Sequence, residues 1–202
     1  MIDNGLMSYF LGIEVKQQHN EIFISQKKYM RDILEKFKMD SCKSVNTPVE
    51  TGIRLSKEGD RRVIEPTLYK SLAGSLRYLM ITRPDIVYRV GLMSWYMERP
   101  METHWVAILR YIKGTLNLSL FYAYGDEAKL VGYSDSDWGC DQDERKNTTG
   151  YVFYLSSTTF SWTSKKQGIV ALSTYEAKYM AASSTICEAI WLRNLLKELE
   201  HP

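Results

Sequence analysis

The stretch Leu130-Val-Gly-Tyr-Ser-Asp-Ser-Asp-Trp138 decides the fold of the C-terminal part of the chain, together with Ala171-Leu-Ser-Thr-Tyr-Glu-Ala-Lys-Tyr-Met180. The first phrase is apolar and rich in β-forming residues, which predicts a strand that ends by presenting Asp135. The second predicts a helix start, because Ser173-Thr-Tyr-Glu176 has the spacing of a capping box. A carboxylate at a strand end facing one on a helix is a minimal cradle for a divalent cation.

The surrounding sequence predicts the remaining elements of this part. Aromatic and β-branched residues predict strands at 129–134, 150–156 and 159–163, with a short continuation at 169–172. Residues 173–187 and 188–200 are expected to be helical, either as two helices or as one. The second of these segments has an apolar face made of Trp191, Leu192, Leu195, Leu196 and Leu199.

The N-terminal part reads as a hairpin followed by helices. Residues 8–15 and 21–25 flank a polar turn, and residues 26–39 form an amphipathic helix. Its apolar stripe consists of Tyr29, Met30, Ile33, Leu34 and Phe37. A long polar loop at 40–65 precedes three predicted helices at 66–80, 84–97 and 101–116, and Thr82 with Asp85 is expected to cap the second. Residues 118–124 are a strand or a connection.

Composition limits the class of protein. The chain has 202 residues, of which 45% are apolar, which is enough for one large or two small soluble domains. The 26 Lys plus Arg against 24 Asp plus Glu give a net charge of only +2, so nucleic-acid binding requires local basic patches. Cys42, Cys140 and Cys187 lack metal-ligand spacing and are expected to be reduced thiols. No signal peptide or membrane span is recognisable, so we expect an intracellular location, cytoplasmic or nuclear, without a membrane partner.

Seven short phrases, in order along the chain, carry a family resemblance. Tyr133-Ser-Asp-Ser-Asp-Trp138, Arg145-Lys-Asn-Thr-Thr-Gly-Tyr151, Ser161-Trp-Thr-Ser-Lys-Lys-Gln167 and Ala171-Leu-Ser-Thr-Tyr-Glu-Ala-Lys-Tyr179 resemble the ribonuclease H domain of copia-type retrotransposon Pol polyproteins. Upstream, Tyr9-Phe-Leu-Gly-Ile-Glu-Val15, Thr82-Arg-Pro-Asp-Ile86 and Leu109-Arg-Tyr-Ile-Lys-Gly-Thr115 resemble the end of the reverse transcriptase of the same polyproteins.

The resemblance implies three regions of an α+β or α/β protein. Residues 1–25 correspond to the end of the palm, with a hairpin like the primer grip. Residues 26–124 correspond to the helical thumb and connection, and residues 125–202 to a truncated ribonuclease H-like domain with a mixed sheet. The palm aspartates that hold the polymerase metals precede the first matched phrase, so polymerase activity is not expected. The truncated sheet is expected to leave an exposed edge through which the chain can self-associate.

Ribonuclease H activity in this family uses carboxylates that hold two Mg²⁺ ions. Asp135 falls on the first of four such ligands. Lys178 stands at the second, where the family has a glutamate, and the other two belong to segments expected to follow Pro202. We therefore expect Asp135 to remain as an ancestral ligand without bound Mg²⁺, in an ion pair with Lys178. Glu176 is expected to cap the helix, and Asp137 to serve a turn or position Trp138.

Basic residues predict where nucleic acid would bind. The candidates are Lys27, Lys28, Arg31, Arg110, Lys113, Lys165 and Lys166. For the residues on helices, a solvated charged face is an equally good interpretation. The expected partner is an RNA–DNA hybrid or another nucleic acid, bound weakly and in a salt-dependent way.

These observations predict a degenerate piece of a retrotransposon reverse transcriptase and ribonuclease H, a pseudoenzyme that binds hybrids without cleaving RNA. One alternative is a residual or partner-completed metal-dependent ribonuclease H, built on Asp135 with Asp137 or Glu176. Another is a retained interaction protein or pathogen effector without catalysis. The chain has no Arg-x-Leu-Arg phrase and no signal peptide, which weighs against a secreted effector of that type.

Overall fold

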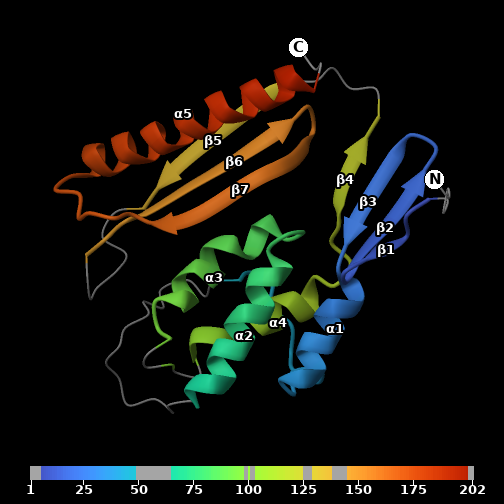
Figure 1. Cartoon of the computed structure of the whole chain (residues 1–202). Coiled ribbons are helices and arrows are strands. Elements are labelled where there is room, and N and C mark those ends of the chain that lie inside the picture. Colours follow the sequence, from blue (N-terminus) through green and yellow to red (C-terminus); the bar gives the residue numbers. More distant parts are fainter. Residues whose placement is uncertain are drawn as a thin grey trace. The chain divides into compact units, whose positions relative to one another are not determined.

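The structure is a computed structural model that describes residues 6–48, 65–97, 100, 103–124, 129–137 and 145–199 (Figure 1). The described residues form two compact units. The first contains those up to Tyr124, and the second contains those from 129 onward. Helices and antiparallel sheets are combined in the chain, so the predicted α+β class is confirmed.

The first unit contains a four-stranded antiparallel sheet in the order β1-β2-β3-β4. Its strands are β1 (Tyr9–Phe10), β2 (Ile13–Gln18), β3 (Glu21–Ser25) and β4 (Leu120–Ala123). The predicted hairpin is β2 and β3, joined by a tight turn at His19 and Asn20. The segment expected as a strand or connection is β4, which pairs with β3 across about a hundred residues of chain. The Phe23 and Phe121 rings pack across this pairing, with their centroids 5.1 Å apart.

Helices enclose the core of the first unit. They are α1 (Lys27–Lys36), α2 (Pro66–Leu79), the 3₁₀ turn η1 (Pro84–Ile86), α3 (Val87–Ser94) and α4 (Thr103–Gly114). The predicted stripe of α1 is confirmed, because it supplies four of the buried core side chains, Met30, Ile33, Leu34 and Phe37. α4 contributes Ile108, Leu109 and Ile112 to the same cluster.

Local chemistry sets both ends of α1. At its start, the Glu14 carboxylate on β2 accepts a 2.6 Å hydrogen bond from the Lys28 backbone N–H, which ties the sheet to the helix. At its end, Lys38 adopts φ +55° and the Met39 N–H donates to the Leu34 carbonyl at 2.8 Å. This left-handed turn stops the helix at Lys36, three residues before the predicted end.

An ion pair between buried Arg83 and partly exposed Asp85 joins the helices of the first unit. Arg83 is 2% exposed and donates to both carboxylate oxygens of Asp85, from Nε at 2.9 Å and from Nη2 at 2.7 Å. Nη2 also donates to Thr115 Oγ1 at 2.7 Å, and the Tyr111 hydroxyl donates to Asp85 at 2.8 Å. The predicted capping role of Thr82 and Asp85 is wrong, because Asp85 is used by Arg83 and the Thr82 hydroxyl donates to buried Gln26.

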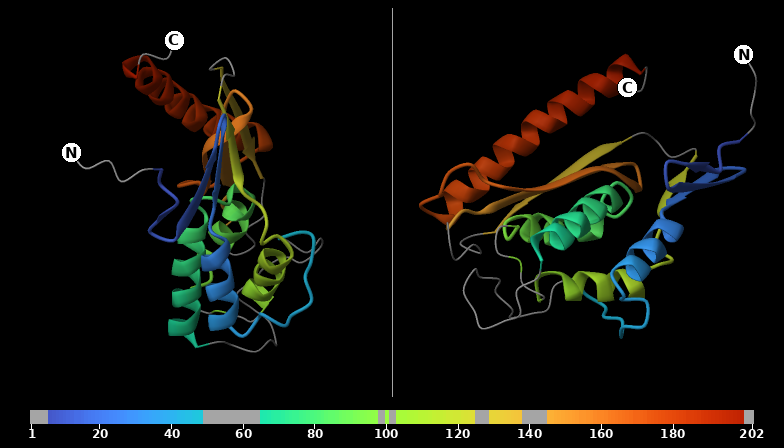
Figure 2. Two further views of the ribbon diagram at one scale, coloured as in Figure 1. Left: turned by 90° about the vertical axis from the view of Figure 1, so that its right-hand side faces the viewer. Right: turned by 60° about the horizontal axis from the view of Figure 1, so that its bottom comes forward.

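The second unit is a three-stranded sheet covered on one face by a helix (Figure 2). It consists of β5 (Leu130–Ser136), β6 (Thr148–Leu155), β7 (Thr158–Lys166) and α5 (Thr174–Glu198). All pairings among these strands are antiparallel, so the expected mixed sheet is wrong for the described residues, in which β5 is an edge strand. The predicted continuation at 169–172 does not form a strand, and the two predicted helical segments form one helix.

The length of α5 raises the question of a membrane span. α5 has 25 residues, but no helix in the described part of the chain combines the length and apolar character that crossing a bilayer requires.

The Arg83–Asp85 ion pair generates a stability prediction. Burial raises the pKa of the Asp85 carboxyl, but the hydrogen bonds and charge of Arg83 and the hydrogen bond from Tyr111 lower it by more, so it lies below its ordinary value. Replacing Asp85 with Asn removes the counter-charge of the buried Arg83 guanidinium, and because the Asp85 side chain is partly exposed we expect a loss of about 1.5–3 kcal/mol in the free energy of unfolding at pH 7. Chemical denaturation measures this loss.

The pH dependence of that loss has a defined sign. The unfolded carboxyl, with a pKa of about 3.9, binds its proton before the folded one, so the contribution is complete above that pH and disappears as the pH falls through the folded pKa. The exposed Asp32 on α1 is a matched control, and Asp32→Asn should change stability by less than about 0.5 kcal/mol. A difference between Asp85→Asn and the unmodified chain that stayed constant down to strongly acidic pH would contradict this assignment.

Candidate nucleic-acid interface and metal site

Strand alternation determines which way Asp135 points. Ser134 on β5 accepts a 2.8 Å hydrogen bond from the Thr185 hydroxyl on α5, so Ser134 faces the helix. Gly132 faces the same way, because a Cβ there would lie 2.4 Å from the Phe153 ring, which is buried in this layer. Neighbouring residues of a strand point to opposite faces, so Asp135 lies on the face that α5 does not cover. It is exposed, and its Oδ1 accepts from the Ser136 N–H at 2.8 Å.

The expected ion pair between Asp135 and Lys178 is therefore wrong. Lys178 is exposed on α5. Among the described residues, its ammonium nitrogen does not lie within 4.0 Å of the carboxylate oxygens of Asp135. The expected pair required the strand end and the helix to face each other through Asp135. In the structure, the sheet separates the two side chains, and Ser134 faces the helix instead.

A two-metal centre requires several carboxylates around one space. Among residues 6–48, 65–97, 103–124, 129–137 and 145–199, no three His, Cys, Asp or Glu side chains form a group that could hold a metal ion. The acidic residues Asp141, Asp143 and Glu144, and also Trp138, lie outside the described residues. The donors described here do not fit the Mg²⁺ centre that the family resemblance implies.

The other acidic candidates have structural roles. The Ser173 hydroxyl accepts from the Glu176 N–H at 3.1 Å, and the Glu176 carboxylate accepts from the Leu172 N–H at 2.6 Å, so the predicted capping box is confirmed. Asp137 exchanges two hydrogen bonds with the backbone of Thr148, which agrees with the favoured turn role.

Gln167 organises the interior of the second unit, and the sequence analysis missed this role. The side chain is buried, and its Nε2 donates to Thr149 Oγ1 at 2.9 Å and to the Ala177 carbonyl at 3.0 Å. Its backbone N–H donates to the Asn147 carbonyl at 2.8 Å. One residue therefore links β6, β7 and α5. The only sequence signal was its place at the end of the Ser-Lys-Lys-Gln phrase.

Two predicted lysines border a groove beside α5. The groove has a volume of about 450 Å³ and is lined by Thr149, Tyr151, Thr163, Lys165, Lys166, Gln167, Gly168, Met180 and Ser184. Lys165 is exposed and pairs with Thr149 across the sheet, so its side chain lies on the face that carries α5. Burial raises the pKa of the Tyr151 hydroxyl, and the charge of Glu188 and its hydrogen bond to this hydroxyl raise it further, so Tyr151 stays neutral at physiological pH.

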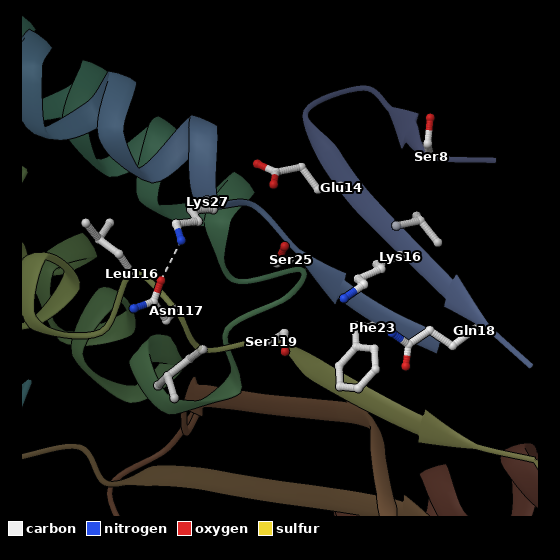
Figure 3. A pocket seen from close by; sticks show the side chains of 12 residues that line it. Ser8, Glu14, Lys16, Gln18, Phe23, Ser25, Lys27, Leu116, Asn117 and Ser119 are labelled. Atoms are coloured by element: carbon white, nitrogen blue, oxygen red, sulfur yellow. Dashed lines mark hydrogen bonds between the residues drawn. The ribbon is translucent and has the colours of Figure 1, made fainter. Parts of the chain in front are cut away.

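A second groove, of about 610 Å³, lies in the first unit between the β2–β3 hairpin and residues 116–119 (Figure 3). Lys27 Nζ donates to Asn117 Oδ1 at 2.6 Å across it. Lys16, which the sequence analysis did not single out, points into the same space above the Phe23 ring. Two ammonium groups, an amide and an aromatic face are the groups that bind a nucleic-acid backbone and a stacked base. Alternation along β2, which places Lys16 with Glu14, is the signal that could have found it.

The remaining basic candidates fall into two pairs. Lys28 and Arg31 are exposed on α1, so they are accessible to a phosphate. Arg110 and Lys113 donate to the carbonyl oxygens of Lys43 and Cys42, at 2.7 Å for Arg110. This second pair anchors the segment after α1 to α4, and its binding of phosphate stays a prediction.

Cys42 and Cys187 are free thiols, and Cys140 lies outside the described residues.

Comparisons with known proteins identify the family. The chain is 40% identical over 200 residues to the retrovirus-related Pol polyprotein from transposon RE1 of Arabidopsis thaliana, covering 98% of this chain and 14% of that protein. It is 41% identical over 211 residues to the Pol polyprotein from transposon TNT 1-94 of Nicotiana tabacum, covering 98% of this chain and 16% of that one. The chain belongs to the copia-type retrotransposon Pol polyproteins.

The same comparisons limit what the family implies. The chain spans about one seventh of the length of the Pol polyproteins it matches. It is also 46% identical over 128 residues to the secreted RxLR effector protein 161 of Plasmopara viticola, covering 61% of this chain and 90% of that protein. No protein-family model matches the chain, and no solved structure matches it.

The central position of Gln167 generates a second prediction. Gln167→Met keeps the length of the side chain but leaves the Ala177 carbonyl and Thr149 without their partner. We expect the free energy of unfolding of the second unit to fall by about 2–4 kcal/mol, since each unsatisfied buried group costs about 1–3 kcal/mol. Gln18→Met, at an exposed position on β2, is the matched control and should change stability by less than about 0.5 kcal/mol. Equal effects of the two substitutions in urea unfolding would refute the role of Gln167.

Proposed function

We propose that this chain is a nucleic-acid-binding part of a retrotransposon Pol protein, which holds the backbone of an RNA–DNA hybrid and does not itself cleave the RNA. In this proposal the first unit derives from the end of the reverse transcriptase. The second derives from the ribonuclease H domain, of which β5, β6, β7 and α5 represent the first strands and helix. Family membership and the order of the matched phrases support this derivation.

The observation that carries the proposal is the groove shared by Lys16 and Lys27. Both ammonium groups reach into one space of about 610 Å³, beside the Asn117 amide and the Phe23 ring (Figure 3). The net charge of the whole chain is only +2, so this local arrangement, and not a general basic field, would attract phosphate. Lys165 and Lys166 both line the groove beside α5, and Lys165 lies on the face that carries α5.

The donors described around Asp135 support binding without cleavage. A single exposed carboxylate cannot supply near-octahedral oxygen ligation to two Mg²⁺ ions. Lys178 stands where the family has its metal-binding glutamate, and Asp135 points away from the helix that carries this position. The proposal therefore assigns no hydrolytic step to the described residues.

A second candidate is an interaction protein without catalysis. One observation favours it: the chain is 46% identical to a protein named as a secreted RxLR effector, over 90% of that protein's length. In that case protein contacts, and not phosphate contacts, would be the retained property.

Salt-dependent binding tests the proposal. We expect the affinity for a labelled RNA–DNA hybrid to fall with salt, and Lys16→Gln with Lys27→Gln to weaken binding and reduce the slope of log K against log salt by roughly 2, about one per phosphate contact. Lys70→Gln with Lys197→Gln, an equal charge change at exposed positions on α2 and α5, should leave the slope unchanged. Fluorescence anisotropy over a salt series measures both.

Measurements of hybrid cleavage and of hybrid binding distinguish the alternatives. The proposal predicts no hybrid cleavage with Mg²⁺ or Mn²⁺. Cleavage that Asp135→Asn abolishes would instead establish a metal-dependent ribonuclease H. Failure to bind hybrid at low salt would contradict the proposal and leave the interaction protein as the better description.

A further inference from the structure

The outward face of α5 carries an apolar stripe that the sheet does not cover. Its large members are Tyr175, Tyr179, Ile186 and Ile190, which are 85%, 79%, 58% and 56% exposed. The opposite face of the helix is the one that packs on β5 and β6, through Ala177, Ala181, Thr185 and Leu192. At 100° per residue the stripe lies well over a quarter-turn from that buried face, so one helix has two separate apolar surfaces.

The spacing of the stripe is that of a helix-packing seam. Tyr175, Tyr179, Ala182 and Ile186 follow each other at intervals of four, three and four residues. Alternation of three and four residues keeps side chains on one line along a helix and lets them interlock with a second helix. Isolated exposed apolar residues are ordinary, but a continuous line of this kind on a surface marks a site of protein contact.

The stripe is also symmetric about its centre. Tyr175 and Ile190 lie equally far from the midpoint between Ala182 and Ser183, and so do Tyr179 and Ile186. An antiparallel copy of α5 placed on this midpoint would set each tyrosine opposite an isoleucine. The small residues would meet at the crossing, where two backbones must approach closely. A two-fold interface requires this kind of self-complementary surface.

We propose that α5 pairs with α5 of a second copy of this chain, antiparallel and centred on Ala182 and Ser183. An aromatic side chain buries about 150–250 Å² when covered, so the stripe offers on the order of 400–500 Å² per copy. A standard interface buries about 800 Å² per partner, so the dimer is weak and depends on concentration. This inference is independent of nucleic-acid binding, and it uses a different surface from the edge strand β5.

Sedimentation velocity over a range of concentrations tests the pairing. We expect the unmodified chain to shift from monomer to dimer, and Ile186→Glu to remain a monomer at all concentrations. Ile169→Glu is the matched control, because Ile169 is also 58% exposed and lies outside α5. Circular dichroism should show both variants folded, since neither replaced side chain is buried. A chain that stayed monomeric, or an equal effect of the two variants, would overturn the proposal.

Cross-linking tests the direction and centre of the pairing. In a chain whose three cysteines are replaced by serine, Ala182→Cys should form a disulfide between copies on mild oxidation. Asn194→Cys should not, because antiparallel pairing places the two copies of residue 194 roughly 30 Å apart. Efficient cross-linking through residue 194 would indicate a parallel pair and contradict the inference. Dimers of Ile186→Glu that persisted in sedimentation would assign association to another surface, such as the β5 edge.

Discussion

The alternation of side chains along β5 is the constraint on which the functional interpretation depends. Ser134 meets Thr185 of α5, and Gly132 leaves room for the Phe153 ring beneath the same helix. With those two residues on the helix side, Asp135 must face the other way. A register shift of one residue would reverse both faces together, and it would place a carboxylate where Ser134 now accepts a hydrogen bond. The second unit thus keeps the strand and helix that the family phrases predict while separating Asp135 from the helix that carries Lys178. That separation is the reason why the proposal assigns these residues no hydrolytic step.

Buried polar side chains explain why several matched phrases have structural roles. Arg83 and Asp85 come from the Thr-Arg-Pro-Asp phrase of the first unit; Arg83 contacts Met30 on α1, and Asp85 accepts from Tyr111 on α4. Gln167 ends the Ser-Lys-Lys-Gln phrase and connects β6, β7 and α5 in the second. A buried polar group is costly unless its hydrogen bonds are satisfied, so each of these residues fixes one arrangement of its neighbours. Such phrases identify a family reliably even where the chemistry of the original enzyme does not depend on them.

The sequence predicted features that depend on local chemistry and missed those that depend on distant partners. The apolar stripe of α1 and the Ser173–Glu176 capping box are local patterns, and both were found. The pairing of β4 with β3 was missed because it joins residues about a hundred positions apart. Asp85 was interpreted as a helix cap because its spacing from Thr82 fits one. In the structure the Asp85 carboxylate is instead the counter-charge of Arg83, which is buried. The proposed pairing of Asp135 with Lys178 failed for the same reason, since spacing along the chain does not reveal which face of a sheet a helix covers.

Engineered disulfides within one chain test the facing of β5 most directly. In a chain without its natural cysteines, Ser134→Cys combined with Thr185→Cys should oxidise readily to an intramolecular disulfide, because the side-chain oxygens of these residues are 2.8 Å apart. Asp135→Cys combined with Lys178→Cys should stay reduced under the same conditions, because the sheet lies between them. Mass spectrometry of the digested chain distinguishes the two. Rapid oxidation of the second pair, with the first pair reduced, would show that Asp135 faces α5 and would restore the expected ion pair with Lys178.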